Sequence, residues 1–167
     1  INILIANLSF SDLLSTIFMP FIVWRTLNFW PFGQTLCASS AYIQVVSIHV
    51  STFSMTAIAF DRYQIFFTSL NFLSIKSRSS SYCCIIIIWI LACVFSIHYT
   101  FYTVSKMPLS TNSTFIVEKC VPQYPQSLVP YKKIMTLTSF STQYVIPLLI
   151  TGVLYAIIIA KMWRTEE

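Results

Sequence analysis

The chain has 167 residues, of which 56% are hydrophobic and only 9% are charged, and its mean hydropathy is +0.74. Soluble domains carry roughly a quarter charged residues, so this composition could not cover a surface that faces water. The two glycines, Gly33 and Gly152, are too few for the glycine-rich loops that bind nucleotide phosphates. The composition therefore predicts a membrane protein.

Four long apolar stretches predict helices that cross a membrane. Each contains at most one charged residue, and each reaches the ~20 residues that a helix needs to span ~30 Å of hydrocarbon. Membrane strands would be only about 10 residues long and alternate in polarity, so the predicted fold class is all-α, a membrane helical bundle. Because the first stretch starts directly at Ile1, we expect the sequence to be a piece of a longer protein. The expected helices cover about residues 1–27, 34–67, 79–102 and 130–163.

A long loop at 103–129 joins the third and fourth expected helices. Within it, residues 113–121 mix β-branched with polar side chains, which indicates a short hairpin that ends near Pro122. The basic residues do not orient the bundle, because alternating spans place five on each side. The net charge of +5 is thus divided between two faces and does not indicate nucleic acid.

Two cysteines and a glycosylation sequon are more informative about sidedness. Alternating spans place Cys37 and Cys120 on the same side, either as two free thiols or as a disulfide, and a disulfide requires an oxidising compartment. The sequon at Asn112 lies in the same loop and indicates the same extracellular or lumenal side. A second sequon begins at Asn7, inside an expected span, where it would stay unused.

Asp12 places a carboxylate near the middle of the first expected span. An acid inside a membrane is costly, so it faces a partner or a water-filled cavity. At 1.5 Å per residue, Asp12 and Ser51 each lie roughly 16 Å from the side at which Arg62 ends the second span. A pocket shared with Asn7 or Ser9 would suit a small hard cation such as Na⁺. The alternative is a protonated, hydrogen-bonded structural aspartate.

The tripeptide Asp61-Arg62-Tyr63 ends the second span. Its neighbouring opposite charges neutralise each other, so Arg62 can stay near the edge of the hydrocarbon. On its own the motif is weak, and Arg62 could equally be an anchor whose long side chain reaches the membrane surface.

In this context the chain resembles the second to fifth transmembrane helices of a rhodopsin-like (class A) G-protein-coupled receptor, a seven-helix fold. The resemblance covers nearly the whole chain, and Asp61 follows Cys37 by the 24 residues of the family's pattern. It departs from the pattern at Ser69, Tyr99 and Thr52. The matching residues are Asn7-Leu8-Ser9-Phe10-Ser11-Asp12-Leu13-Leu14, Trp30-Pro31-Phe32-Gly33, Cys37, Asp61-Arg62-Tyr63, Trp89, Cys120, Pro147 and Tyr155.

The resemblance implies a receptor of the plasma membrane with several spans, which activates a heterotrimeric G protein and binds arrestin. It implies a disulfide between Cys37 and Cys120. It also implies that Arg62 is held by Asp61 at rest and turns to the G protein and Tyr155 on activation, a two-state element that a ligand biases. The residues expected to carry coupling are Asp61, Arg62, Tyr63, Tyr155 and Leu70.

Gln44 bears on the ligand, because it lies 18 residues before Arg62, in the outer half of the same helix. Amine receptors of this family place an aspartate there, since a buried ammonium needs a counter-ion. An uncharged amide instead suits a peptide or its C-terminal amide, although Gln44 could simply bond a neighbouring helix. Together with Trp30-Pro31-Phe32-Gly33, Gln44 makes the chain similar to neuropeptide Y/F-type receptors. The expected ligand-binding residues are Gln44, Trp30, Ser47 and Gln143.

Some observations leave alternatives open. The extracellular side carries five basic residues against one acid, Glu118, whereas peptides of that group are basic at their ends. Class A receptors for non-peptide ligands, and a transporter or channel, are the other candidates. No paired acids or Ser/His set indicate an enzyme, and no cofactor is expected beyond Na⁺ at Asp12. We interpret His49 and His98 as packed neutral imidazoles rather than ligands or proton switches.

Overall fold

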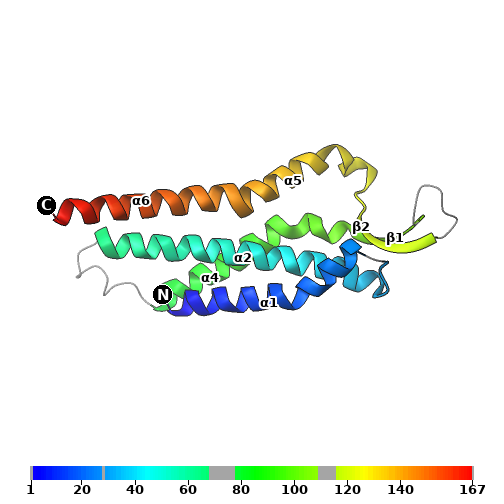
Figure 1. Ribbon diagram of the computed structural model, residues 1–167, viewed down its shortest axis with the longest axis horizontal. Helices are drawn as coiled ribbons and strands as arrows, with labels where there is room; N and C mark the ends of the chain where they lie inside the picture. The colour runs from blue at the N-terminus through cyan, green and yellow to red at the C-terminus, as the bar shows by residue number, and fades with distance from the viewer. Residues whose placement is uncertain (1, 28, 68–77, 109–115, 167) are drawn as a thin grey trace.

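The protein is described by a computed structural model over residues 2–27, 29–67, 78–108 and 116–166. Long helices run along one axis, with a β-hairpin at one end, and α1 begins and α6 ends at the opposite end (Figure 1). In this part of the chain, four helical segments are long and apolar enough to cross a membrane, so the predicted all-α membrane bundle is confirmed. The long helices are α1 (Asn2–Leu27), α2 (Gly33–Phe67), α4 (Arg78–Ser96) and α6 (Ile146–Glu166).

α2 is the central helix, and it packs against α1, α4 and α6. The main core joins Leu4 of α1 to Val46 and Val50 of α2 and to Ile88 and Ala92 of α4. Each pair within α2 and α4 is four residues apart, so its side chains lie on one face of the helix. The side chains of Val50 and Ala92 are fully buried, which lets the helices approach closely.

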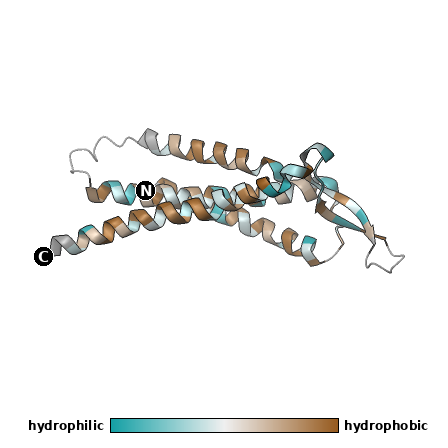
Figure 2. Cartoon of the chain, turned by 90° about the horizontal axis from the view of Figure 1, so that it is seen from above, coloured by the Kyte–Doolittle hydropathy of each residue, from teal (hydrophilic) through white to brown (hydrophobic). Residues whose placement is uncertain are grey.

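The outer faces of the helices are apolar. On α4, Ile86, Ile87, Ile90 and Val94 are each more than 50% exposed, and hydrophobic residues run along the helices in Figure 2. In water such a surface would promote aggregation, but hydrocarbon tails cover it without cost. The exposure therefore fits a bundle that lies in a bilayer.

The third span is shorter than the predicted helix at 79–102. α4 ends at Ser96, and a 3₁₀ segment, η1 (Ile97–Phe101), follows it. In η1 the chain tightens, and the His98 side chain bonds Ser139 of α5 at 3.1 Å between Nε2 and Oγ. Packing of a side chain against another helix thus ends the α-helix before its apolar run ends.

The predicted hairpin is present, but its first strand lies upstream of 113–121. β1 (Tyr102–Pro108) pairs antiparallel with β2 (Ile116–Pro122), with Val104 opposite Cys120. β2 ends at Pro122 as predicted. β1 begins at the last residue of the expected helix at 79–102 and continues into the expected loop at 103–129, because the uncharged, partly β-branched run that ends at Ser105 fits either structure.

The last span is not one regular helix over 130–163. Turn η2 (Gln126–Tyr131) leads into α5 (Lys132–Phe140), one π turn η3 (Ser141–Val145), and then α6. The Ile146 N–H donates to the Ser141 carbonyl, five residues back. Pro147 has no N–H to donate to the carbonyl of Gln143, and its ring would clash with that carbonyl in a regular helix. The wider turn removes this conflict.

Candidate functional site

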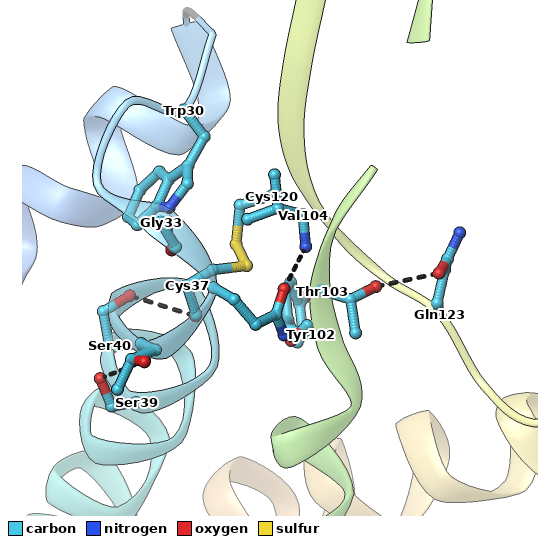
Figure 3. The surroundings of a disulfide bond; sticks show 12 residues. Trp30, Gly33, Cys37, Ser39, Ser40, Tyr102, Thr103, Val104, Cys120 and Gln123 are labelled. Carbon is cyan, nitrogen blue, oxygen red and sulfur yellow. Dashed lines mark hydrogen bonds between the residues drawn. A yellow bond between two sulfur atoms is a disulfide. The ribbon is translucent and has the colours of Figure 1, made fainter. Parts of the chain in front are cut away.

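A disulfide fixes the outer end of the bundle. It joins Cys37 in the first turns of α2 to Cys120 in β2, and both residues are buried (Figure 3). Trp30 packs against it with only 1% of its surface exposed, and its indole N–H donates to the Gly33 carbonyl at 2.8 Å. Gly33 starts α2 with a φ of +77°, which favours glycine. The disulfide that the resemblance implied is confirmed.

Backbone bonds hold the hairpin over α2 in addition to the disulfide. The Trp30 N–H donates to the Glu118 carbonyl at 2.6 Å. The Gln34 amide bonds β1 twice, since its nitrogen donates to the Tyr102 carbonyl at 3.2 Å and its oxygen accepts from the Val104 N–H at 2.7 Å. The hairpin is therefore anchored to both the start of α2 and the segment before it.

Basic side chains and tyrosine rings meet near the hairpin. The Arg25 guanidinium lies 4.6 Å from the centre of the Tyr102 ring, and the Lys132 ammonium lies 5.9 Å from that of Tyr124. Burial raises the pKa of the Tyr124 phenol, and the nearby tyrosines add to the rise. The ring thus stays neutral at physiological pH and can stack against a cation.

The residues predicted to bind the ligand differ in their burial and in their hydrogen-bond partners. Gln44 is buried and donates from Nε2 to the Ser15 hydroxyl at 2.7 Å, while its Oε1 has no hydrogen-bond partner among the described residues. The Gln143 amide nitrogen lies 3.3 Å from Nδ1 of His49. Ser47 is fully buried and donates to its own helix at the Ile43 carbonyl.

Trp30 and Ser47 therefore have no exposed side-chain surface for a ligand. Trp30 packs on the disulfide and Ser47 packs inside the bundle. That these two residues contact the ligand stays a prediction. Gln44 and Gln143 keep amide groups that can exchange their present partners for a ligand.

Asp12 and Ser51 meet in mid-bundle, as their predicted depth required. The Ser51 hydroxyl donates to Asp12 Oδ1 at 2.6 Å and lies 2.8 Å from the Ser11 hydroxyl. Asn7 does not join them, since it bonds Ser54 and Trp89 at 2.9 Å each. A carboxylate and two hydroxyls are hard oxygen donors, the kind that small hard cations prefer.

Asp61 and Arg62 lie at the inner end of α2, opposite the hairpin. The Asp61 side chain is 8% exposed, whereas Arg62 is exposed. The Tyr63 ring stacks on Phe67, with 4.6 Å between the ring centres. Tyr155 on α6 is 44% exposed, and within the described residues no hydrogen bond joins it to Arg62.

A lysine ties α6 to this end of α2. The Lys161 ammonium donates to the Phe66 carbonyl at 2.9 Å and lies 4.0 Å from the centre of the Phe67 ring. Carbonyls in the last turn of a helix have no partner within it, and a cation is stabilised there by the helix dipole. The contact holds the inner ends of the two helices together.

Comparison with known proteins decides the family. The family model of the 7 transmembrane receptor (rhodopsin family) matches residues 1–167. The chain belongs to the rhodopsin family. The human neuropeptide Y receptor type 4-2 is 32% identical over 98% of this chain. The Mus musculus neuropeptide Y receptor type 6 is 34% identical over 88% of it, and the Xenopus laevis neuropeptide Y receptor type 1 is 33% identical over 99%.

This rhodopsin-family chain spans less than half of the length of each of these relatives. It covers 44% of the human, 41% of the Mus musculus and 46% of the Xenopus laevis receptor. Family membership and four apolar helices make it a multi-pass protein of the plasma membrane. The predicted resemblance, to class A receptors and to their neuropeptide Y group, is confirmed. Leu70 and Asn112, predicted for coupling and glycosylation, lie outside the described residues.

Sequence reasoning missed two polar side chains of this rhodopsin-family bundle. His49 was interpreted as a packed imidazole, and it is indeed fully buried, but it also bonds three helical segments. Gln34 was not singled out, although it anchors β1. No local sequence pattern marks this role of His49, because Thr142 and Ser96 come from other helical segments.

Proposed function

We propose that the protein is a receptor for an extracellular peptide of the neuropeptide Y kind and that it activates a heterotrimeric G protein. The observation that carries the proposal is the similarity to three receptors named for neuropeptide Y, over 88–99% of this chain. Such a receptor acts by changing its conformation when the peptide binds, so we propose no enzymatic reaction.

The outer half of the bundle supports a peptide rather than an amine. Gln44 stands where an amine receptor would need a counter-ion, and its buried Oε1 lacks a hydrogen-bond partner within the part of the chain that the structure describes. A peptide N–H or C-terminal amide would satisfy this oxygen. We propose Gln44 and Gln143 as ligand contacts, with Trp30 and the disulfide holding the hairpin beside the entrance.

The inner end supports coupling. We propose that Asp61, Arg62, Tyr63 and Tyr155, together with Leu70, form the surface that binds the G protein and afterwards arrestin. The exposed Arg62 is available to a partner, whereas Asp61 is buried beside it in the chain. A ligand that binds one of two states better would shift the balance between a held and a released Arg62.

We also propose that Na⁺ binds at Asp12 and Ser51 and favours one state of the receptor. The hydrogen bond from the Ser51 hydroxyl to the Asp12 carboxylate holds these two oxygen ligands next to each other in mid-bundle. The cation would replace this bond by contacts with the same oxygens.

The test is nucleotide exchange in cells that lack endogenous neuropeptide Y receptors. The full-length protein is expressed and exposed to neuropeptide Y, and GTP exchange is measured on each class of G protein. We expect exchange to rise with the peptide and to be lost in Arg62→Ala, while Lys133→Ala, an exposed basic residue on the outer side, responds normally.

Two results would overturn the proposal. An undiminished response in Arg62→Ala would remove the coupling role of that arginine. An absence of response to peptides, together with strong amine responses in Gln44→Asp, would identify a receptor for another class of ligand.

A further inference from the structure

His49 lies at the junction of α2, α4 and the π turn η3, and its side chain is fully buried. Its Nε2 is 3.2 Å from the Thr142 hydroxyl. Its Nδ1 is 3.0 Å from the Val45 carbonyl, 3.2 Å from the Ser96 hydroxyl and 3.3 Å from the Gln143 amide nitrogen. Four polar groups therefore compete for two ring nitrogens.

The hydrogen bonds from His49 to these four groups cannot all form at once, because the neutral ring carries one proton. The Thr142 hydroxyl donates to the Thr138 carbonyl at 2.9 Å, so its oxygen accepts from His49 and the ring proton is on Nε2. The bare Nδ1 then accepts from Gln143 and Ser96. In this first arrangement the Nδ1 lone pair faces the Val45 carbonyl, which is unfavourable.

A second arrangement satisfies Val45 instead. The ring proton is on Nδ1 and is donated to the Val45 carbonyl, so the bare Nε2 accepts from the Thr142 hydroxyl. That hydroxyl leaves the Thr138 carbonyl, and the Gln143 amide nitrogen loses its acceptor. The imidazole carries one proton in both arrangements, because one nitrogen loses the proton that the other gains.

We propose that His49 is a positioning residue that couples Gln143 to the π turn by exchanging these two tautomers. A ligand that accepts the Gln143 N–H removes a donor from Nδ1 and so favours the Nδ1-protonated form. The Thr142 hydroxyl then moves from its helix backbone to the ring, at the turn that precedes Pro147. The inference rests on the proposed function, because Gln143 is a proposed ligand contact there.

The two arrangements are discrete. The first leaves the Nδ1 lone pair facing the Val45 carbonyl, and the second removes Nδ1 as an acceptor for both the Gln143 amide and the Ser96 hydroxyl. They therefore form a two-state element that a ligand can bias. His98, the other histidine of the chain, bonds Ser139 of α5 alone among side chains of the described residues, and it has no competing donor of this kind. It serves as the matched control.

The first experiment needs no ligand. The full-length protein is labelled with ¹⁵N-histidine in lipid nanodiscs, and the His49 resonances are assigned by their loss in His49→Phe. We expect the Nε2-protonated tautomer in the native protein and a shift towards the Nδ1-protonated tautomer in Gln143→Leu, which removes the donor. His98→Phe should leave the His49 resonances in place. Unchanged tautomers in Gln143→Leu, or an imidazolium in both proteins, would overturn the inference.

The second experiment separates coupling from binding. With neuropeptide Y as the probe, we expect His49→Phe to lower peptide-stimulated nucleotide exchange by at least about fivefold. The peptide Kd without G protein should change by less than about threefold, since His49 itself does not reach the ligand. His98→Phe should retain stimulated exchange once matched for surface expression, and an equal loss in both variants would overturn the inference.

The two experiments also distinguish the proposals. If Gln143→Leu moves the tautomer and neuropeptide Y causes no exchange, the ligand assignment fails and the His49 element stands. If the peptide activates the native protein and the tautomers do not respond to Gln143→Leu, the His49 element fails and the receptor function stands.

Discussion

Removal of the disulfide tests whether the covalent bond or the polar contacts hold the hairpin over α2. Cys37 and Cys120 are 83 residues apart in the sequence, and closing a loop of that length in a random chain would stabilise the folded state by about 4.5 kcal/mol. The real gain is smaller, because helices that unfold within a bilayer stay inserted and keep their outer ends near one surface. We therefore expect a loss of about 2–4 kcal/mol in Cys37→Ala/Cys120→Ala.

The measurement is thermal unfolding of the purified protein in detergent. A loss of that size corresponds to a Tm lower by at least several degrees in the full-length protein. The native protein treated with a reductant should unfold at a similarly lowered temperature, because it loses the bond and keeps both side chains. Cys83→Ala, which changes an exposed thiol on α4, is the control and should match the native Tm.

A Tm within about 2 °C of the control, for both the double variant and the reduced protein, would refute this reasoning. The hairpin would then be held by its non-covalent contacts, the Gln34 bonds to β1 and the Trp30 bond to Glu118. Gln34→Ala in the reduced protein would in that case cause the loss that the disulfide did not.

Three further substitutions follow from the same structure. Trp30→Phe loses the indole bond to the Gly33 carbonyl and should lower the free energy of unfolding by about 1–2 kcal/mol, measured by thermal unfolding; an unchanged Tm would contradict it. Asp12→Asn keeps a partner for Ser51 but loses the charge, so the effect of Na⁺ on peptide affinity should fall from several-fold to under about twofold in radioligand binding with Na⁺ or choline. Lys161→Met loses the bond to the Phe66 carbonyl, so the distance between spin labels on the inner ends of α2 and α6 should spread; the native distribution would contradict it.

Elements set by composition and helix geometry could be predicted from the sequence. The spans follow from hydropathy, since only helices satisfy their own backbone in hydrocarbon. The contact between Asp12 and Ser51 follows from counting 1.5 Å per residue from the same membrane surface, and the structure places their side chains 2.6 Å apart. The prediction of the spans needs only one helix at a time. The prediction of the contact needs only the depth of two residues below the same membrane surface.

Features that depend on several elements at once could not be predicted in this way. The first residues of β1, up to Ser105, continue the uncharged stretch of α4, and only the pairing with β2 determines that they form a strand. The prediction that Trp30 and Ser47 contact a ligand comes with the family resemblance, which does not show which neighbours cover a side chain. The competition for the His49 ring needs Thr142, 93 residues away, and no local pattern brings it there.

The bonds that hold α2 also limit what any single substitution can do. α2 bonds α1 through Gln44 and Ser51, η3 through His49 and α6 through Phe66. Hydrogen bonds between helices in a membrane contribute about 0.6–1.7 kcal/mol each. Reversing a two-state equilibrium from 1:99 to 99:1 requires about 5.5 kcal/mol, so about three to nine such bonds must differ between the states. Loss of one bond should therefore shift basal activity only part of the way from the inactive to the active state. Only a ligand that acts on several bonds can switch the receptor completely.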